Sequence, residues 1–158
     1  MKSLDYEGLK QEVIHIMENN KSIVLATCSN NRVTAREVYY ASNNFSIYFF
    51  TSKAYDKYKQ IEKNRNVALC LGNIQMEGIA IIKGHPNLSE NETETTICLK
   101  KSRKEFEHFI KYKNTILIEV LVTRVGLWKN NGREYLDINK GESYRVGWNT
   151  AWYILSSD

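Results

Sequence analysis

Apolar and β-branched residues alternate with polar ones through much of the chain, and short Asn-rich turns interrupt them. Residues 23–27, 33–40 and 45–51 are three such runs, and each favours an extended conformation. Asn30-Asn31 and Ser42-Asn43-Asn44 separate them, and Asn tolerates the left-handed backbone that tight hairpins need. The pattern therefore predicts three hairpin-linked strands in an antiparallel meander.

The remaining periodicity predicts more strands and several flanking helices. Helical spacing indicates helices over residues 4–19, over 53–64 and through the segment that ends at Ile110. Further strands are expected over 66–71, 78–83, 115–125, 134–138 and 143–155. The run 45–51 carries bulky side chains on both faces, so both faces should be covered. We expect one domain over residues 1–158, mainly β with flanking helices, folded as a six- to seven-stranded antiparallel split β-barrel.

Composition narrows the range of functions. The hydrophobic fraction of 42% and charged fraction of 25% are ordinary for a globular protein, and the net charge of +4 is scattered along the chain. The densest basic run, residues 100–104, fits a solvated helix face, so no nucleic-acid partner is expected. The sequence has no apolar run of membrane-spanning length and no signal peptide at its start. We therefore expect no membrane association and a cytoplasmic location.

Motifs for common catalytic and metal chemistry are missing from the sequence. Cys28, Cys70 and Cys98 are widely spaced without a Cys-x-x-Cys pair, which indicates reduced thiols. The three histidines lack ligand spacing, so no metal site is expected. Neither a Gly-rich nucleotide loop nor a Gly-x-Ser-x-Gly elbow occurs. Catalytic side chains are therefore left unassigned.

A candidate anion site is formed by Arg36, within a predicted strand, and Lys57, near the start of a predicted helix. A half-buried guanidinium needs an anionic partner, and a helix N-terminus already favours an anion. A phosphate bound by these two residues, Thr51 and Ser52 would satisfy both conditions. The alternative is a cross-strand ion pair between Arg36 and a carboxylate such as Glu77, with Lys57 simply solvated.

An ordered series of short motifs between residues 22 and 84 resembles the pyridoxamine 5′-phosphate oxidase-like family, the FMN-binding split barrels. The series is Leu25-Ala26-Thr27, Arg36-Glu37-Val38, Phe50-Thr51, Lys57, Asn64 to Leu69 and Lys83-Gly84. The chain departs from the family pattern at Asn31-Arg32-Val33, which replaces Gly-x-Pro, and at Tyr55 and Asp56 before the phosphate lysine. It also lacks the basic, proline-containing end of the true oxidases, so oxidation of pyridoxamine phosphate is not expected.

The resemblance implies a homodimer with two FMN molecules at the subunit interface. By it, Arg36 and Lys57 hold the phosphate, and the backbone from Arg36 through Glu37 and Val38 to Tyr39 borders the flavin ring. Phe50 and Thr51 would lie beside the ribityl chain, while Ser52 is a candidate phosphate ligand on the residue pattern alone. Candidates to flank the flavin from the partner subunit are Trp128, Trp148 and Trp152, with Tyr144 and Tyr153, although packing in the core or dimer seam explains each equally well.

Three functional hypotheses follow. The first is a cytoplasmic FMN-dependent oxidoreductase that passes electrons between NAD(P)H, or another small donor, and a small flat acceptor. Such an enzyme needs no catalytic acid, base or nucleophile of its own, because the flavin carries the chemistry. The second is a flavin- or haem-binding module with a sensing, storage or stress-related role and no turnover. The third is an empty barrel that acts as a protein-interaction dimer.

Overall fold

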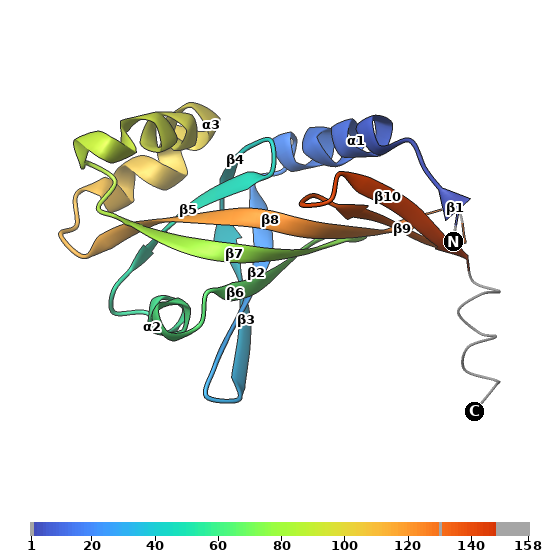
Figure 1. Cartoon of the computed structure of the whole chain (residues 1–158). Coiled ribbons are helices and arrows are strands. Elements are labelled where there is room, and N and C mark those ends of the chain that lie inside the picture. The colour runs from blue at the N-terminus through green and yellow to red at the C-terminus, as the bar shows by residue number, and fades with distance from the viewer. Residues whose placement is uncertain (1, 130, 148–158) are drawn as a thin grey trace.

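The computed structural model describes residues 2–129 and 131–147, which form one antiparallel sheet with α-helices packed against it (Figure 1). The helices are α1 (Tyr6–Glu18), α2 (Asp56–Lys63) and α3 (Glu92–Ile110), with a 3-10 turn at Ser89–Asn91. The strands are β1 (Lys2–Ser3), β2 (Ser22–Ser29), β3 (Arg32–Tyr39), β4 (Ala41–Asn43), β5 (Ser46–Ser52), β6 (Asn66–Leu71), β7 (Ile74–Gly84), β8 (Thr115–Lys129), β9 (Gly132–Asp137) and β10 (Glu142–Gly147).

The long strand β8 organises the sheet. Its first half pairs with β5 and its second half with β9, while β7 pairs with it along the other edge. From β7 the sheet continues through β6 and β2 to β3, and from β9 it continues through β10 to β1. No ladder joins β3 to β5 among the described residues, so the barrel is split. The predicted fold class is confirmed. The described sheet has ten strands, more than the six or seven expected, and the short strands β1 and β4 are two of the additional ones.

The predicted meander is wrong at its third strand. The turn at Asn30 and Asn31 forms as expected, with φ of 51° and 62°, and β2 pairs with β3. After β3, however, Tyr40 is fully buried, its hydroxyl donates to the Met17 carbonyl at 2.5 Å, and its N–H donates to the Lys21 carbonyl. These contacts redirect the chain into the β4–β5 hairpin, which turns at Asn44. Strand β5 therefore pairs with β8 instead of β3.

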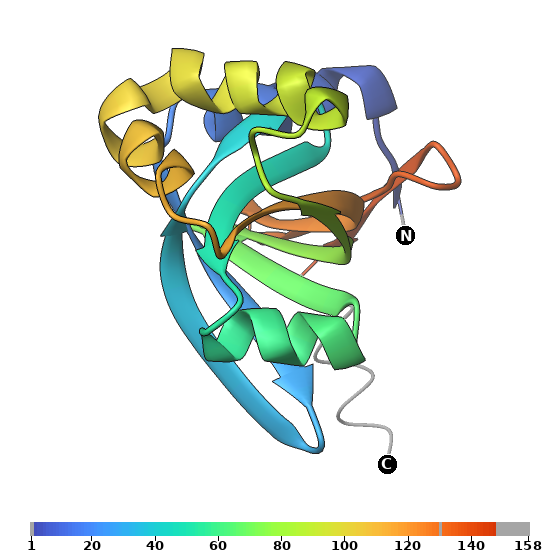
Figure 2. The same ribbon diagram turned by 90° about the vertical axis from the view of Figure 1, so that its left-hand side faces the viewer.

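Both faces of β5 are covered, as its sequence predicts. Ile47 and Phe49 are fully buried in the main core, to which α1 contributes Val13 and Met17. On the opposite face, Tyr48 packs in a second cluster with residues of α3. Figure 2 shows α1 and α3 along one side of the molecule and α2 on the other, beside the β2–β3 hairpin. A helix of the same chain therefore supplies the cover that the sequence alone did not assign.

Two helices differ from the sequence expectation, α2 in where it begins and α3 in its continuity. Helix α2 starts at Asp56 rather than near Lys53, because the Ser52 hydroxyl accepts the Ala54 N–H at 3.2 Å in a turn that precedes the helix. Helix α3 is broken at Ser102, whose φ of −158° and ψ of 84° are extended. None of the described helices is both long and apolar enough to cross a bilayer.

Candidate functional site

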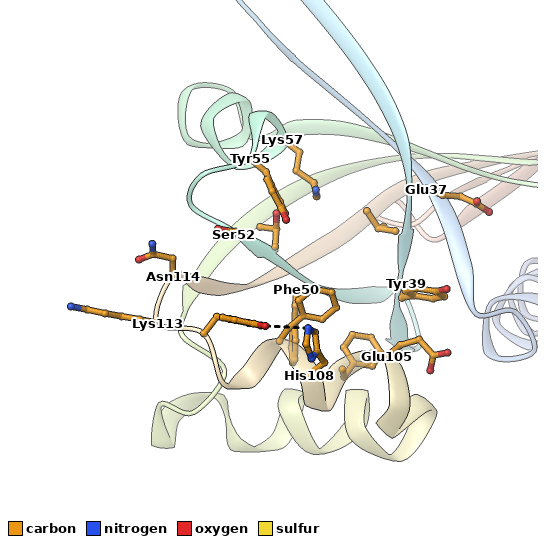
Figure 3. A pocket seen from close by; sticks show the side chains of 15 residues that line it. Glu37, Tyr39, Phe50, Ser52, Tyr55, Lys57, Glu105, His108, Lys113 and Asn114 are labelled. Atoms are coloured by element: carbon orange, nitrogen blue, oxygen red, sulfur yellow. Dashed lines mark hydrogen bonds between the residues drawn. The ribbon is translucent and has the colours of Figure 1, made fainter.

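A pocket of about 570 Å³ lies between the sheet and the C-terminal part of α3 (Figure 3). One wall comes from β3, β5 and the start of α2, and the other from the end of α3 and the loop after it. The lining residues are Glu37, Val38, Tyr39, Phe50, Thr51, Ser52, Tyr55, Lys57, Glu105, Phe106, His108, Phe109, Tyr112, Lys113 and Asn114. Its volume is within the range of small-molecule and cofactor sites.

Seven of the eight residues that the sequence predicts to bind a cofactor line this pocket. They are Glu37, Val38, Tyr39, Phe50, Thr51, Ser52 and Lys57. The eighth, Arg36, is half-buried on β3 and lies next to the pocket rather than in its lining. The fold thus brings together residues from two strands and a helix that are up to 21 positions apart in the chain, counted from Arg36 to Lys57.

Neutral oxygen atoms hold the Arg36 guanidinium. It donates to the Leu25 carbonyl at 3.2 Å, to the Thr27 hydroxyl at 2.8 Å, and to the Thr34 hydroxyl. Both hydroxyls in turn donate to Gln60 Oε1, at 2.6 and 2.7 Å. These contacts use three of the five N–H donors of the guanidinium. The buried network fixes the orientation of Arg36 without neutralising its charge.

The ion pair considered for Arg36 does not form. Glu77 pairs instead with Arg124 at 3.6 Å, and Arg36 has no carboxylate within ion-pair distance among the described residues. Burial is the main cause that lowers the pKa of Arg36. The nearby Asp56 carboxylate raises this pKa, and the Arg32 guanidinium lowers it further. The Asp56 carboxylate contacts Arg32 at 3.3 Å, at the exposed end of the β2–β3 hairpin. The acid that precedes Lys57 is therefore engaged outside the pocket.

Lys57 is the second residue of α2, and its ammonium lies 4.7 Å from the centre of the Tyr55 ring. Burial lowers its pKa, and repulsion by Arg36 lowers it further. In the part of the chain that the structure describes, no carboxylate pairs with Lys57, and no side chain caps the N-terminus of α2. Two cations and a helix N-terminus thus create a positive end of the pocket that favours an anion.

The Thr51 hydroxyl provides independent evidence for a ligand at this end. Thr51 is 5% exposed, and its Oγ1 has no hydrogen-bond partner in the described structure. A buried hydroxyl without a partner costs about 1–3 kcal/mol, so native proteins seldom leave one. Because Thr51 lines the pocket from β5, a bound anion that reaches its Oγ1 would supply the missing partner.

The α3 wall was not predicted from the sequence. Ser102 interrupts the helix with an extended backbone, and its hydroxyl donates to the Glu105 carboxylate. The segment from Ser102 to Glu105, Ser-Arg-Lys-Glu, has the spacing of a capping box, and this motif was the sequence signal for a helix that restarts here. The restarted helix directs Phe106 onto Phe50, with ring centres 4.9 Å apart, and directs His108 to the pocket.

Trp128 and Tyr144, the described members of the aromatic set expected to reach the flavin of a partner subunit, do not line the pocket of their own chain. Trp128 lies on β8, is 44% exposed, and has the Arg133 guanidinium 4.7 Å from its ring centre. Tyr144 stacks on Tyr135 at 5.0 Å. Trp148, Trp152 and Tyr153 lie outside the described residues. The described residues also contain no cluster of three metal-ligating side chains.

Comparisons with solved structures show proteins of the same fold. General Stress Protein 26 from Bacillus anthracis has a TM-score of 0.62 and 23% identity, over 82% of this chain and 98% of that one. An FAD-binding protein from Mesorhizobium loti has a TM-score of 0.61 and 15% identity, over 78% and 94%. HutZ, the haem storage protein from Vibrio cholerae, has a TM-score of 0.62 and 10% identity, over 82% and 94%.

A search of curated protein sequences gave no match. The family model described as pyridoxamine 5′-phosphate oxidase, however, matches residues 9–128, from α1 to the end of β8. That range includes both walls of the pocket and the two cations at its positive end. The chain belongs to the pyridoxamine 5′-phosphate oxidase family.

Proposed function

We propose that the pocket binds FMN and that its positive end holds the phosphate. The observation that carries this proposal is the Lys57 ammonium, unpaired among the described residues, in a pocket that the partnerless Thr51 hydroxyl also lines, with the charge of Arg36 close enough to lower the pKa of Lys57. A phosphate carries close to two negative charges and several acceptor oxygens. It would form an ion pair with Lys57 and accept a hydrogen bond from the Thr51 hydroxyl. Its negative charge would also offset the repulsion between Arg36 and Lys57.

The other lining residues fit the remainder of the cofactor. Val38 is buried and Phe50 half-buried, so they provide an apolar surface for a flat ring. The exposed Tyr39 extends this surface at the rim. A bound flavin would supply hydride or electron transfer, while the protein binds it, orients it and limits the access of water. Pockets of this kind combine an apolar lining with a few well-placed polar groups.

The protein would act as an oxidoreductase that takes electrons from NAD(P)H or another small donor, and it would work as a homodimer. Exposed apolar side chains on the outer face of the sheet support the dimer. Ile79 on β7 and Leu121 on β8 are direct cross-strand neighbours and are 40% and 41% exposed. Val24 on β2 is 38% exposed. Adjacent exposed apolar side chains on strands are a common mark of a protein interface.

The absorption spectrum of the isolated protein, before and after addition of FMN, tests the proposal. Binding would give a flavin spectrum that stays with the protein during gel filtration. Anaerobic bleaching by NADH or NADPH, followed by recovery with an added acceptor, would demonstrate oxidoreductase activity. A protein that stays colourless and does not retain added FMN would contradict the proposal.

A second candidate is a flavin- or haem-binding module without turnover. The solved structures described as FAD-binding and haem storage proteins favour it, and His108 adds an imidazole, a common haem ligand, to the pocket. Titration with haemin, monitored through the haem absorption band, measures this binding. Reproducible turnover with NAD(P)H and an acceptor would exclude a purely binding role.

A further inference from the structure

The proposed FMN site occupies the strand wall of the pocket and leaves the α3 wall without a ligand. That wall presents Phe109 and Tyr112, which are 40% and 53% exposed, together with the exposed His108. Three aromatic side chains therefore face the same cavity from one short segment. Because apolar rings of this size normally pack in the core, their joint exposure in a pocket is typical of a binding surface.

The chain fixes this segment at both ends. At its start, Phe106 is 2% exposed and packs edge-on against Phe50. At its end, the Thr115 hydroxyl donates to the Phe109 carbonyl at 2.6 Å. His85 contacts the Tyr112 carbonyl through Nε2 at 3.0 Å. Hydrogen bonds and packing thus fix the backbone that carries the side chains of this wall.

The proton on His85 can be assigned from its neighbours. Its Nδ1 accepts the Asn87 N–H at 3.0 Å, so in the neutral ring the proton is on Nε2, which donates to the Tyr112 carbonyl. The loop before α3 thereby holds the segment after it. His85 does not line the pocket, so its contribution is to position Tyr112.

His108 and Tyr112 are the polar groups that this aromatic surface offers. The Tyr112 hydroxyl lies 3.3 Å from His108 Nε2, and the ring centres are 5.3 Å apart. A dashed line in Figure 3 marks this contact at His108, which lies below Phe50, while Lys113 extends away from it. His108 also contacts Phe109 edge-on, with ring centres 5.6 Å apart, and both His108 and Tyr112 remain exposed in the pocket. Each carries an N–H or O–H that can turn toward a ligand.

We propose that His108 and Tyr112 recognise the substrate, and that the substrate class is a flat aromatic molecule with an exocyclic oxygen, such as a ketone, quinone or nitro compound. The ring would lie against Phe109, and its oxygen would accept a hydrogen bond from the His–Tyr pair. The inference rests on the proposed function, since it places this molecule opposite the flavin, but it concerns a different wall of the pocket.

Acetophenone and ethylbenzene form a matched pair of probes, because they have nearly the same shape and only acetophenone has an oxygen. Binding is followed by NMR through the signals of the probe itself, which can be measured in every variant, and in the wild type also through the imidazole signals, which are few because the chain has three histidines. We expect acetophenone to bind more tightly and to shift the His108 signals. In Tyr112→Phe or His108→Phe, the preference for acetophenone should fall about fivefold, as expected for loss of one neutral hydrogen bond. Lys111→Met, at an exposed position just outside the pocket, should leave the preference unchanged.

The result can be separated from the fate of the FMN proposal. Both aromatic variants should retain FMN as the wild type does, because neither residue belongs to the phosphate end. If FMN binds but acetophenone and ethylbenzene bind equally, or the variants keep the full preference, the inference is overturned and the flavin proposal stands. If FMN does not bind but the preference and its loss in the variants are observed, the recognition pair is supported and the flavin proposal fails.

Discussion

Replacing Lys57 by Met separates its role in binding from its role in folding. Without ligand, the substitution removes a cation–π contact with Tyr55, which at a partly exposed site is worth about 0.5–1 kcal/mol. It also removes the repulsion between Lys57 and Arg36. The two effects have opposite signs. The free energy of unfolding should therefore change by less than about 1 kcal/mol.

With FMN, the same substitution should have a large effect. A charge-assisted hydrogen bond to phosphate contributes about 1.5–3 kcal/mol, so the Kd should rise roughly 10- to 150-fold. At an FMN concentration of ~100 times the wild-type Kd, ligand binding stabilises the wild type by ~2.7 kcal/mol. The variant would gain only about 0.3–1.4 kcal/mol at that concentration. For a chain of 158 residues, these values correspond to a Tm increase of roughly 5–11 °C for the wild type and less than ~6 °C for the variant.

Fluorescence titration of FMN and thermal unfolding with and without FMN measure both effects. Lys59→Met is the matched control, because Lys59 is on the same helix but is exposed and outside the pocket. It should behave as the wild type in both assays. An unchanged FMN affinity in Lys57→Met, combined with a loss of more than ~2 kcal/mol in the apo protein, would refute the reasoning and make Lys57 a structural residue.

Three further predictions follow from the structure. Thr51→Val should stabilise the apo protein by about 1 kcal/mol, because it removes a buried hydroxyl without a partner, and it should weaken FMN binding about fivefold. Chemical denaturation measures the stability and FMN titration measures the affinity. A destabilised apo protein would contradict this prediction. Tyr40→Phe removes the hydrogen bond to Met17, so it should cost about 1 kcal/mol near neutral pH. Burial raises the pKa of Tyr40 to about 12, so the wild type should lose stability as pH rises from about 10 to 12, whereas the variant should lose less; equal slopes in alkaline denaturation would refute this. Ile79→Asp should convert the proposed dimer to monomers of unchanged secondary structure, as measured by light scattering and circular dichroism, and a wild type that is already monomeric would remove the proposed interface.

The local sequence determined most of the strands and the first hairpin of this protein. Alternating apolar residues set most of the strands, and Asn30 and Asn31 set the first hairpin because their backbone accepts positive φ. The spacing of Arg36, Thr51 and Lys57 indicated an anion site. The hairpin depends on residues that are close in sequence, so its physical cause can be found in the sequence alone, whereas Arg36 and Lys57 are 21 positions apart and only the fold brings them together.

Tertiary structure decided which strand pairs with which and what covers the pocket. Nothing local indicates that β5 pairs with β8, some 70 residues later, because register between distant strands depends on the burial of residues such as Tyr40. The same holds for His108 and Tyr112, which reach the pocket only because α3 restarts at Ser102 and folds back over β5. Long-range packing thus supplied the second wall of the site, and neither periodicity nor motif spacing encodes such contacts.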